Sequence, residues 1–226
     1  DPMVERRSGF LAPTQGYSDD KGFIYGQPYF LAIDRARDLE IEPTIYSRDG
    51  LTLQSRYRHA FYNGALDLKT TAGIISEPKT TSDAEKIGFK GSIDFKGEFS
   101  LNETWRSTLD IEQSSNKTFR RKYLSDDKEM LTSNVLLEGF RSRNYFSMNG
   151  YKFQGLRATD DKRRQPIVLP TLQYNLIGEP DYYGGRFQMA SSLTSISREI
   201  GADSKKLSVS TGWKLPHYSP SGEIYT

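Results

Sequence analysis

The stretch FKGSIDFKGEFSL, residues 89–101, indicates the fold class because apolar and polar side chains alternate along it without a break. Its odd positions are Phe, Gly, Ile or Leu, and its even positions are only Lys, Ser, Asp or Glu. Successive side chains of a β-strand point to opposite faces of a sheet. A period of two over this length therefore predicts a strand with one apolar and one polar face.

The same alternation recurs along most of the chain. It predicts further strands at residues 39–46, 51–61, 65–75, 105–112, 131–140, 145–154, 169–176, 186–196 and 206–215. Short turn sequences such as Arg48-Asp49-Gly50 and Asn63-Gly64 separate them and predict an antiparallel meander. Longer polar spacers cover residues 76–86, 114–129 and 158–165, and we expect them to fall inconsistently on the two edges of the sheet. The sequence shows no convincing helix and no interior domain boundary.

Composition favours a membrane barrel over a soluble domain. Hydrophobic residues make up 35% of the chain, aromatic residues 12%, and the mean hydropathy is -0.67, whereas a soluble domain usually has about 45–50% apolar residues, glycine included. A transmembrane barrel fits this profile because only the lipid-facing half of each strand must be apolar and aromatic residues mark both interfaces. No apolar run is long enough for a transmembrane helix.

Several classes of function are disfavoured. The net charge is only +2, so no strong field attracts nucleic acid. The chain has no cysteine and two histidines, His59 and His217, that are far apart in the sequence. We therefore expect no disulfide, no catalytic residues, no metal site and no cofactor, and the protein is not expected to be an enzyme.

Alternation alone leaves two other folds open. A soluble β-sandwich that serves as a binding module has the same pattern, although sandwich strands commonly run about 5–6 residues and several strands predicted here are longer. Another outer-membrane barrel, such as a porin or receptor, is the second alternative. We expect an all-β fold, an antiparallel meander that forms an incomplete segment of a large transmembrane β-barrel.

The first 60 residues carry a recognisable series of motifs. The element Arg6, Arg7, Ser8, Gly9, Phe10, Leu11, Ala12, Pro13 is followed by Gln27-Pro28-Tyr29-Phe30-Leu31 and by Asp38-Leu39-Glu40-Ile41-Glu42-Pro43. This order resembles the start of the barrel in the LptD family (OstA or Imp) of lipopolysaccharide-assembly proteins. Later stretches, such as Trp213-Lys214-Leu215-Pro216, match less specifically.

The resemblance implies a fold, a function and partners. Residues 1–226 would be one segment of an outer-membrane β-barrel, comprising its first strands, with the periplasmic domain and the remaining strands outside the segment; both chain ends look like cuts. The family assembles lipopolysaccharide into the outer leaflet of the outer membrane of Gram-negative bacteria. Its partners would be lipopolysaccharide, an LptE-like lipoprotein plug and the periplasmic Lpt bridge, reached through the N-terminal domain.

Pro28 and Pro43 are the most informative single residues. Proline has no N–H to donate to a sheet ladder, so it weakens pairing. The two lie 15 positions apart on adjacent predicted strands, and we expect both to weaken one seam. The resemblance implies that this seam is a lateral gate for lipid A. The alternative is that they are strand-edge prolines without a gating role.

The polar parity of the strands predicts residues that face a hydrated lumen. The basic members are Arg56, Arg58, Lys69, Lys90, Lys96 and Arg106. One reading is a hydrated wall that contacts sugar and plug, and the alternative is that Arg56 and Arg58 bind lipid A phosphates. The aromatic residues are expected either at membrane interfaces or in sheet packing: Phe23, Tyr25, Tyr29, Phe30, Tyr57, Phe61, Trp105 and Trp213.

Overall fold

The computed structural model describes residues 6–76, 87–218 and 224–225. Its described strands are β1 (Gly9–Phe10), β2 (Thr14–Ser18), β3 (Gly22–Gly26), β4 (Tyr29–Ala32), β5 (Arg37–Tyr46), β6 (Gly50–Phe61), β7 (Gly64–Ser76), β8 (Ile87–Ser100), β9 (Trp105–Ser114), β10 (Met130–Arg141), β11 (Asn144–Gly155), β12 (Ile167–Ile177), β13 (Arg186–Ser197), β14 (Ser204–Lys214), β15 (His217–Tyr218) and β16 (Ile224–Tyr225). Two short helices are described, α1 (Phe119–Leu124) and η1 (Lys162–Arg164). None of the described helices is long and apolar enough to cross a membrane.

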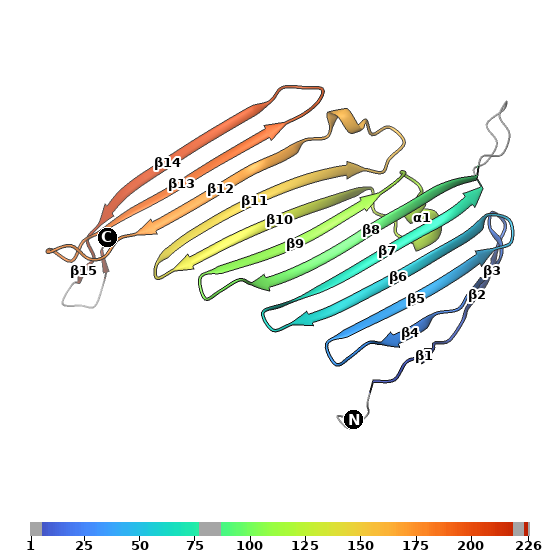
Figure 1. The fold of residues 1–226 in the computed structure, drawn as a ribbon. Helices are drawn as coiled ribbons and strands as arrows, with labels where there is room; N and C mark the ends of the chain where they lie inside the picture. The colour runs from blue at the N-terminus through green and yellow to red at the C-terminus, as the bar shows by residue number, and fades with distance from the viewer. Residues whose placement is uncertain (1–5, 77–86, 219–223, 226) are drawn as a thin grey trace. The chain divides into compact units, whose positions relative to one another are not determined.

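The strands confirm the all-β antiparallel meander (Figure 1). One sheet of 14 strands runs in the order β1-β4-β5 and then strand by strand to β14. Outside this order, β2 pairs with β3, and β3 also pairs with β5. Within it, β5 pairs with β6 from Arg37↔His59 to Tyr46↔Gly50 without a register shift. All ten predicted strands are present, with ends within a few residues of the predicted ones.

The chain clusters into two compact units. Unit 1 comprises residues 1–98, 109–133 and 154–160, and unit 2 comprises residues 99–108, 134–153 and 161–226. In unit 1 the connections at residues 33–36 and 62–63 define one edge, and in unit 2 the connections at 101–104, 142–143 and 178–185 do so. We call these the short-turn edge of each unit, because the longest described connection, 115–129, leaves from the opposite side of the meander. The connections at 47–49 and 198–203 also leave from that opposite side.

Two expectations about the spacers are wrong. Residues 119–124, inside the spacer at 114–129, form helix α1. A helix of six residues of mixed polarity is too short to show a helical period in the sequence. The spacers at 114–129 and 158–165 also begin at the same edge: the N–H of Leu156 donates to the carbonyl of Glu129 at 2.8 Å, and Lys117 Nζ donates to the carbonyls of Ala158 and Asp160. Connections two apart in a meander always share an edge. The spacer at 76–86 lies outside the described residues except for Ser76.

The core of unit 1 is small and lies on one face of the sheet. Tyr46 and Ile75 of the sheet pack with Phe119 and Tyr123 of α1, and all four are buried. Tyr46 and Tyr123 meet edge to face with ring centroids 5.3 Å apart. Of the other described residues only Ile24 packs against this core as a partly buried hydrophobic residue, so most of the apolar residues of the strands remain outside it.

Candidate functional site: an apolar face opposite a polar wall

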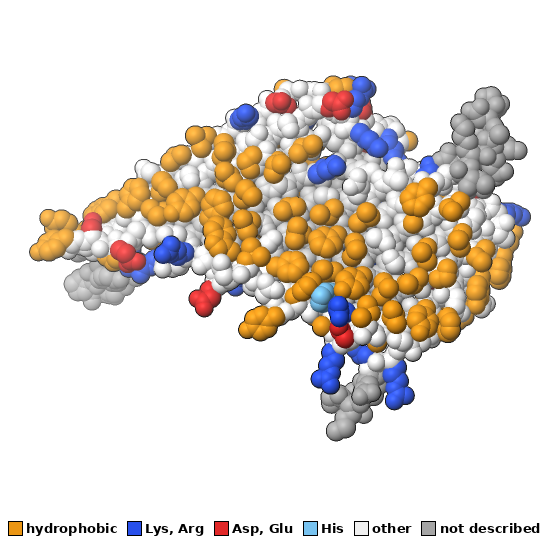
Figure 2. Space-filling view, viewed as in Figure 1, with side chains coloured by type: hydrophobic (Ala, Val, Ile, Leu, Met, Phe, Trp, Pro, Cys, Tyr) orange, Lys and Arg blue, Asp and Glu red, His pale blue; other side chains and the backbone are white. Residues whose placement is uncertain are grey.

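In both units the apolar side chains at alternate strand positions form an uncovered surface, which we call the apolar face. In unit 1 its side chains include Ile45, Leu51, Leu53, Ile74, Phe89 and Ile93, which are 44–75% exposed. In unit 2 they include Val135, Met148, Phe187, Leu207, Val209 and Trp213, which are 41–71% exposed. Figure 2 shows hydrophobic side chains gathered over the strands on the face seen in Figure 1.

The opposite face of unit 1 is the polar wall, and it carries ion pairs. Arg56 Nη2 lies 2.6 Å from Asp67 Oδ2 across β6 and β7, and Arg58 Nε lies 2.6 Å from Asp38 Oδ1 across β5 and β6. Lys69 stands beside Arg56 in the β6–β7 register. The structure thus brings Arg56, Arg58 and Lys69 to one wall, but two of the three are held by carboxylates, which disfavours them as phosphate ligands.

The other basic residues predicted for this wall lie on β8 and β9. Lys96 Nζ lies 3.7 Å from Asp110 Oδ2. Lys90 lies an even number of positions from Lys96 on β8, and therefore on the same face of the strand. In unit 2 the Arg106 guanidinium lies over the ring of Phe140, 5.4 Å from the ring centroid. Their position beside a lumen stays a prediction.

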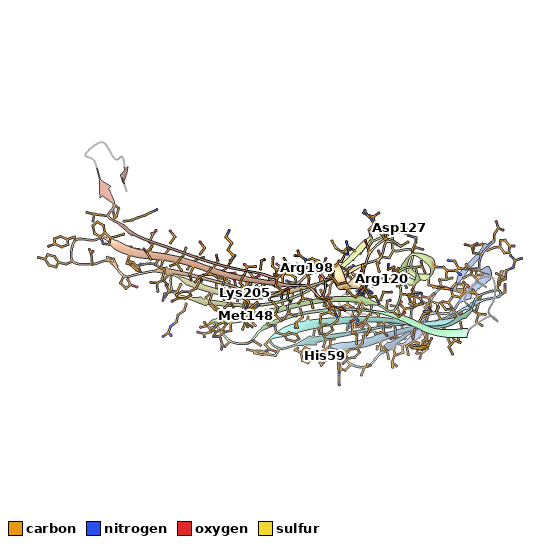
Figure 3. The ribbon with its side chains drawn as sticks, turned by 90° about the horizontal axis from the view of Figure 1, so that it is seen from above. His59, Arg120, Asp127, Met148, Arg198 and Lys205 are labelled. Atoms are coloured by element: carbon orange, nitrogen blue, oxygen red, sulfur yellow. The ribbon has the colours of Figure 1, made fainter. Side chains whose placement is uncertain are left out.

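The segment between β9 and β10, residues 115–129, folds back over the polar wall, and we call it the β9–β10 segment. Figure 3 shows His59 projecting from one side of the unit 1 sheet and Arg120 of this segment on the other. Arg120 is only 4% exposed. Its Nη1 lies 2.8 Å from Asp94 Oδ1 on β8, and its Nη2 lies 2.7 Å from Asp126 Oδ2. One buried guanidinium therefore ties the segment to the wall and to itself.

A second buried group anchors the end of α1. The Tyr123 hydroxyl donates to Asp49 Oδ2 at 2.6 Å, and Lys122 Nζ lies 2.6 Å from the same oxygen. Burial, and then the hydrogen bond to the Asp49 carboxylate, raises the pKa of Tyr123. A pocket of about 320 Å³ remains between the segment and the wall, lined by residues that include Glu42, Arg56 and Lys69.

The N-terminal motif forms the first edge of the sheet. Arg6 Nη2 lies 2.8 Å from Asp38 Oδ2, so the buried Asp38 carboxylate holds both Arg6 and Arg58. The Ser8 hydroxyl accepts a hydrogen bond from the N–H of Ala32, and Gly9 pairs with Phe30. Arg7 is exposed, and Phe10 meets Tyr29 with ring centroids 5.0 Å apart.

Prolines interrupt neighbouring strands at matched positions. Leu11-Ala12-Pro13 separates β1 from β2 and stands beside Gln27-Pro28, which separates β3 from β4. Gln27-Pro28 in turn stands beside Pro43 of β5. The N–H of Leu11 donates to the carbonyl of Pro28 at 3.0 Å, and the N–H of Gln27 donates to the carbonyl of Pro43 at 3.2 Å. Pro13 belongs to this row although only Pro28 and Pro43 were predicted from the sequence, and its spacing of 15 from Pro28 equals that between Pro28 and Pro43.

The two prolines do not weaken a single seam as expected. The N–H and C=O of a strand residue point to the same neighbouring strand. Pro28 therefore lacks a donor toward β1 and β2, and Pro43 lacks one toward β3 and β4. The missing donors fall on two successive seams and face the same way. A weakening of these seams stays a prediction.

Among the described residues there is no group of three or more His, Cys, Asp or Glu that could hold a metal ion. His59 lies on the apolar face, where its ring packs on Phe61 with centroids 3.7 Å apart and its Nδ1 lies 3.3 Å from the Tyr57 hydroxyl. His217 lies in β15.

These features define a class of protein: an open antiparallel sheet whose strands expose an apolar face and carry a polar wall, consistent with a segment of a transmembrane β-barrel. The chain belongs to the LptD family, because the family model described as LPS transport system D matches residues 88–226.

Curated relatives agree with this assignment. The chain is 28% identical over 196 residues to the LPS-assembly protein LptD of Actinobacillus pleuropneumoniae serotype 5b, a match that covers 81% of this chain and 24% of the relative. It is 26% identical over 213 residues to that of Hahella chejuensis, covering 88% and 26%. A 64-residue match to that of Ralstonia nicotianae is 47% identical and covers 27% and 8%. The chain thus spans about a quarter of the length of the first two relatives.

Proposed function

We propose that this chain is a segment of an outer-membrane protein that assembles lipopolysaccharide into the outer leaflet of a Gram-negative bacterium. The observation that carries the proposal is the uncovered apolar face opposite the polar wall. In water a surface of this kind would be covered by another protein layer, whereas in a bilayer acyl chains cover it. Membership of the LptD family supplies the cargo, lipopolysaccharide.

The division of the sheet into two faces supports a two-path route for an amphipathic glycolipid. The sugars would pass along the hydrated wall that carries Arg56, Arg58 and Lys69, and the acyl chains would leave through a strand seam. The row at Pro28 and Pro43 supports a seam at the first edge, because each proline removes a hydrogen-bond donor toward the edge.

The connections support one orientation. Outer-membrane barrels have short periplasmic turns and longer extracellular loops. The short-turn edge would therefore face the periplasm, and the β9–β10 segment would enter the barrel from the cell surface. An LptE-like plug and a periplasmic bridge that delivers lipopolysaccharide are the partners this function requires.

Depletion of the full-length protein tests the proposal. Cells that lose it should accumulate lipopolysaccharide inside and show little at the surface, measured by labelling intact cells with an antibody or a sugar-directed probe. Full surface labelling after depletion would contradict the proposal. The sandwich alternative requires a second layer over the apolar face, and the described residues provide none.

The gate is tested separately by Pro28→Ala combined with Pro43→Ala. The new N–H groups restore donors at both seams, so surface lipopolysaccharide should fall while the amount of folded protein stays the same. Pro180→Ala in the exposed connection at 178–185 is the matched control. Normal export by the double variant would remove the gate and leave the assembly function standing.

A further inference from the structure

A hollow of about 960 Å³ lies in unit 2 at the short-turn edge. It is lined by three aromatic residues whose side chains belong to the apolar face: Trp105 from β9, Phe146 from β11 and Tyr174 from β12. Ligand pockets are commonly about 300–1,000 Å³ in volume and lined by apolar and aromatic side chains with a few polar groups. This hollow has both parts, because polar residues of the connections stand at its rim.

The floor of the hollow requires a glycine. A Cβ added to Gly139 would lie 2.8 Å from Cζ3 and 2.9 Å from Cη2 of Trp105, so the indole lies directly over the backbone of β10. Trp105 meets Phe146 edge to face with ring centroids 5.8 Å apart. Phe146 stands opposite Tyr174 in the β11–β12 register. These rings form a continuous apolar wall against which an acyl chain can lie.

Two amides at the rim are oriented by the backbone. Asn102 Oδ1 accepts hydrogen bonds from the N–H groups of Thr104 and Trp105, each at 2.9 Å. Asn144 Oδ1 accepts one from the N–H of Ile177 at 3.2 Å. Because the oxygen of each amide is occupied, its NH₂ group is the end left to donate. Both residues line the hollow.

Two opposite charges complete the rim. Arg141 and Glu103 both line the hollow and are exposed, and neither forms an ion pair with a described residue. A guanidinium beside two amide donors suits a phosphate group. A carboxylate nearby suits a protonated amine. The rim therefore matches a headgroup that carries both.

We propose that this hollow binds one phospholipid whose phosphate is linked to a protonated amine, as in phosphatidylethanolamine. The phosphate contacts Arg141 and the NH₂ groups of Asn102 and Asn144, the amine contacts Glu103, and an acyl chain lies along Trp105 and Phe146. The inference rests on the proposed function, since that function places the apolar face in lipid and the short-turn edge at the leaflet that contains phospholipid.

Quenching of tryptophan fluorescence tests the site. The full-length protein is placed in lipid nanodiscs that contain a minor fraction of lipid with brominated acyl chains and an ethanolamine, choline or glycerol headgroup. The contribution of Trp105 is the difference between the parent and Trp105→Phe. Brominated phosphatidylethanolamine should quench Trp105 at roughly fivefold lower mole fraction than the choline lipid, which has no N–H to donate to Glu103.

Variants separate the parts of the site. Glu103→Gln should abolish the preference for ethanolamine over choline, and Arg141→Ala should weaken quenching by both. Gly139→Val displaces the indole and should abolish the preference, whereas Gly212→Ala, where an added Cβ meets nothing within 4 Å, should leave it unchanged. Equal quenching by all three headgroups, or a preference for the glycerol lipid, would overturn the proposal.

Trp213, which lies on the apolar face of β14, distinguishes this failure from failure of the proposed function. Its contribution is obtained in the same way from Trp213→Phe. Quenching of Trp213 by every brominated lipid, with no headgroup preference at Trp105, rejects the binding site alone. Quenching of neither tryptophan by any lipid rejects the membrane position and the binding site together.

Discussion

The Tyr123 hydroxyl donates a hydrogen bond of 2.6 Å to a carboxylate oxygen of Asp49, a residue 74 positions earlier in the chain. This contact joins helix α1 to the connection between β5 and β6, and it fixes the β9–β10 segment over the polar wall. In the proposed route, the sugars that pass along that wall would pass beside this segment. The contribution of Tyr123 and of Arg120 to holding the segment in place can be measured.

Removal of the Tyr123 hydroxyl should loosen the segment. Tyr123→Phe keeps the ring in the core and leaves Asp49 paired only with Lys122, so docking should weaken by about 2 kcal/mol, or roughly 30-fold. Hydrogen exchange of the backbone amides of residues 115–129, followed by mass spectrometry, measures this. Tyr62→Phe, at a fully exposed tyrosine in the β6–β7 turn, is the control. Equal exchange in the two variants would show that the hydroxyl is no anchor.

Two neighbouring arginines should differ sharply. Arg120→Ala leaves the partly buried carboxylates of Asp94 and Asp126 without their cation, which should cost about 3 kcal/mol in docking of the segment. Arg121→Ala removes a guanidinium that is 59% exposed and lies 3.6 Å from Asp127, and it should change little. Protease cleavage within residues 115–129 of the folded protein reports the difference. Similar cleavage of both variants would contradict the anchoring role of Arg120.

Acid should release part of the attachment of the β9–β10 segment. Burial raises the pKa of Asp126, but the hydrogen bonds and charge of Arg120, with the N–H of Lys128, outweigh it and hold the pKa below its ordinary value of 3.8. A carboxyl with a lowered folded pKa stabilises the fold fully above its unfolded pKa, and the contribution disappears as the pH falls through the folded pKa. Protection of the amides of residues 115–129, taken relative to their intrinsic exchange rate at each pH, should therefore fall below about pH 4. Asp126→Asn should lack this part of the fall, and an identical profile for the variant would exclude Asp126 as its source.

Gly185 should be required for the position of Trp213. An added Cβ would lie 2.1 Å from Cζ2 of the indole, and the Trp213 Nε1 donates to Asp181 Oδ2 at 2.7 Å in the same connection. Gly185→Ala should move the indole off this connection and break the hydrogen bond. A shift in Trp213 fluorescence relative to Gly212→Ala measures the effect. No shift would mean that the connection at 178–185 moves to make room for the added Cβ and leaves the Trp213 indole in place.

The sequence by itself determined the strands and their two faces. Alternation along residues 89–101 depends only on neighbouring positions, because a strand points each side chain to the opposite face from the last. The exposed Phe89 and Ile93 on one side, with Asp94 reaching Arg120 from the other, follow directly from that parity. The motif at the N-terminus likewise predicted the family that the comparisons show.

Only the tertiary structure decided what covers the polar wall and how the interruptions align. In the sequence Arg120 is one of several charges in a polar spacer, and in the structure it is buried between Asp94 of β8 and Asp126 of its own segment. Pro13, Pro28 and Pro43 become a row only when their strands pair in register. These relationships join residues far apart in the chain, and a local pattern carries no information on which distant groups satisfy a buried charge or a missing hydrogen-bond donor.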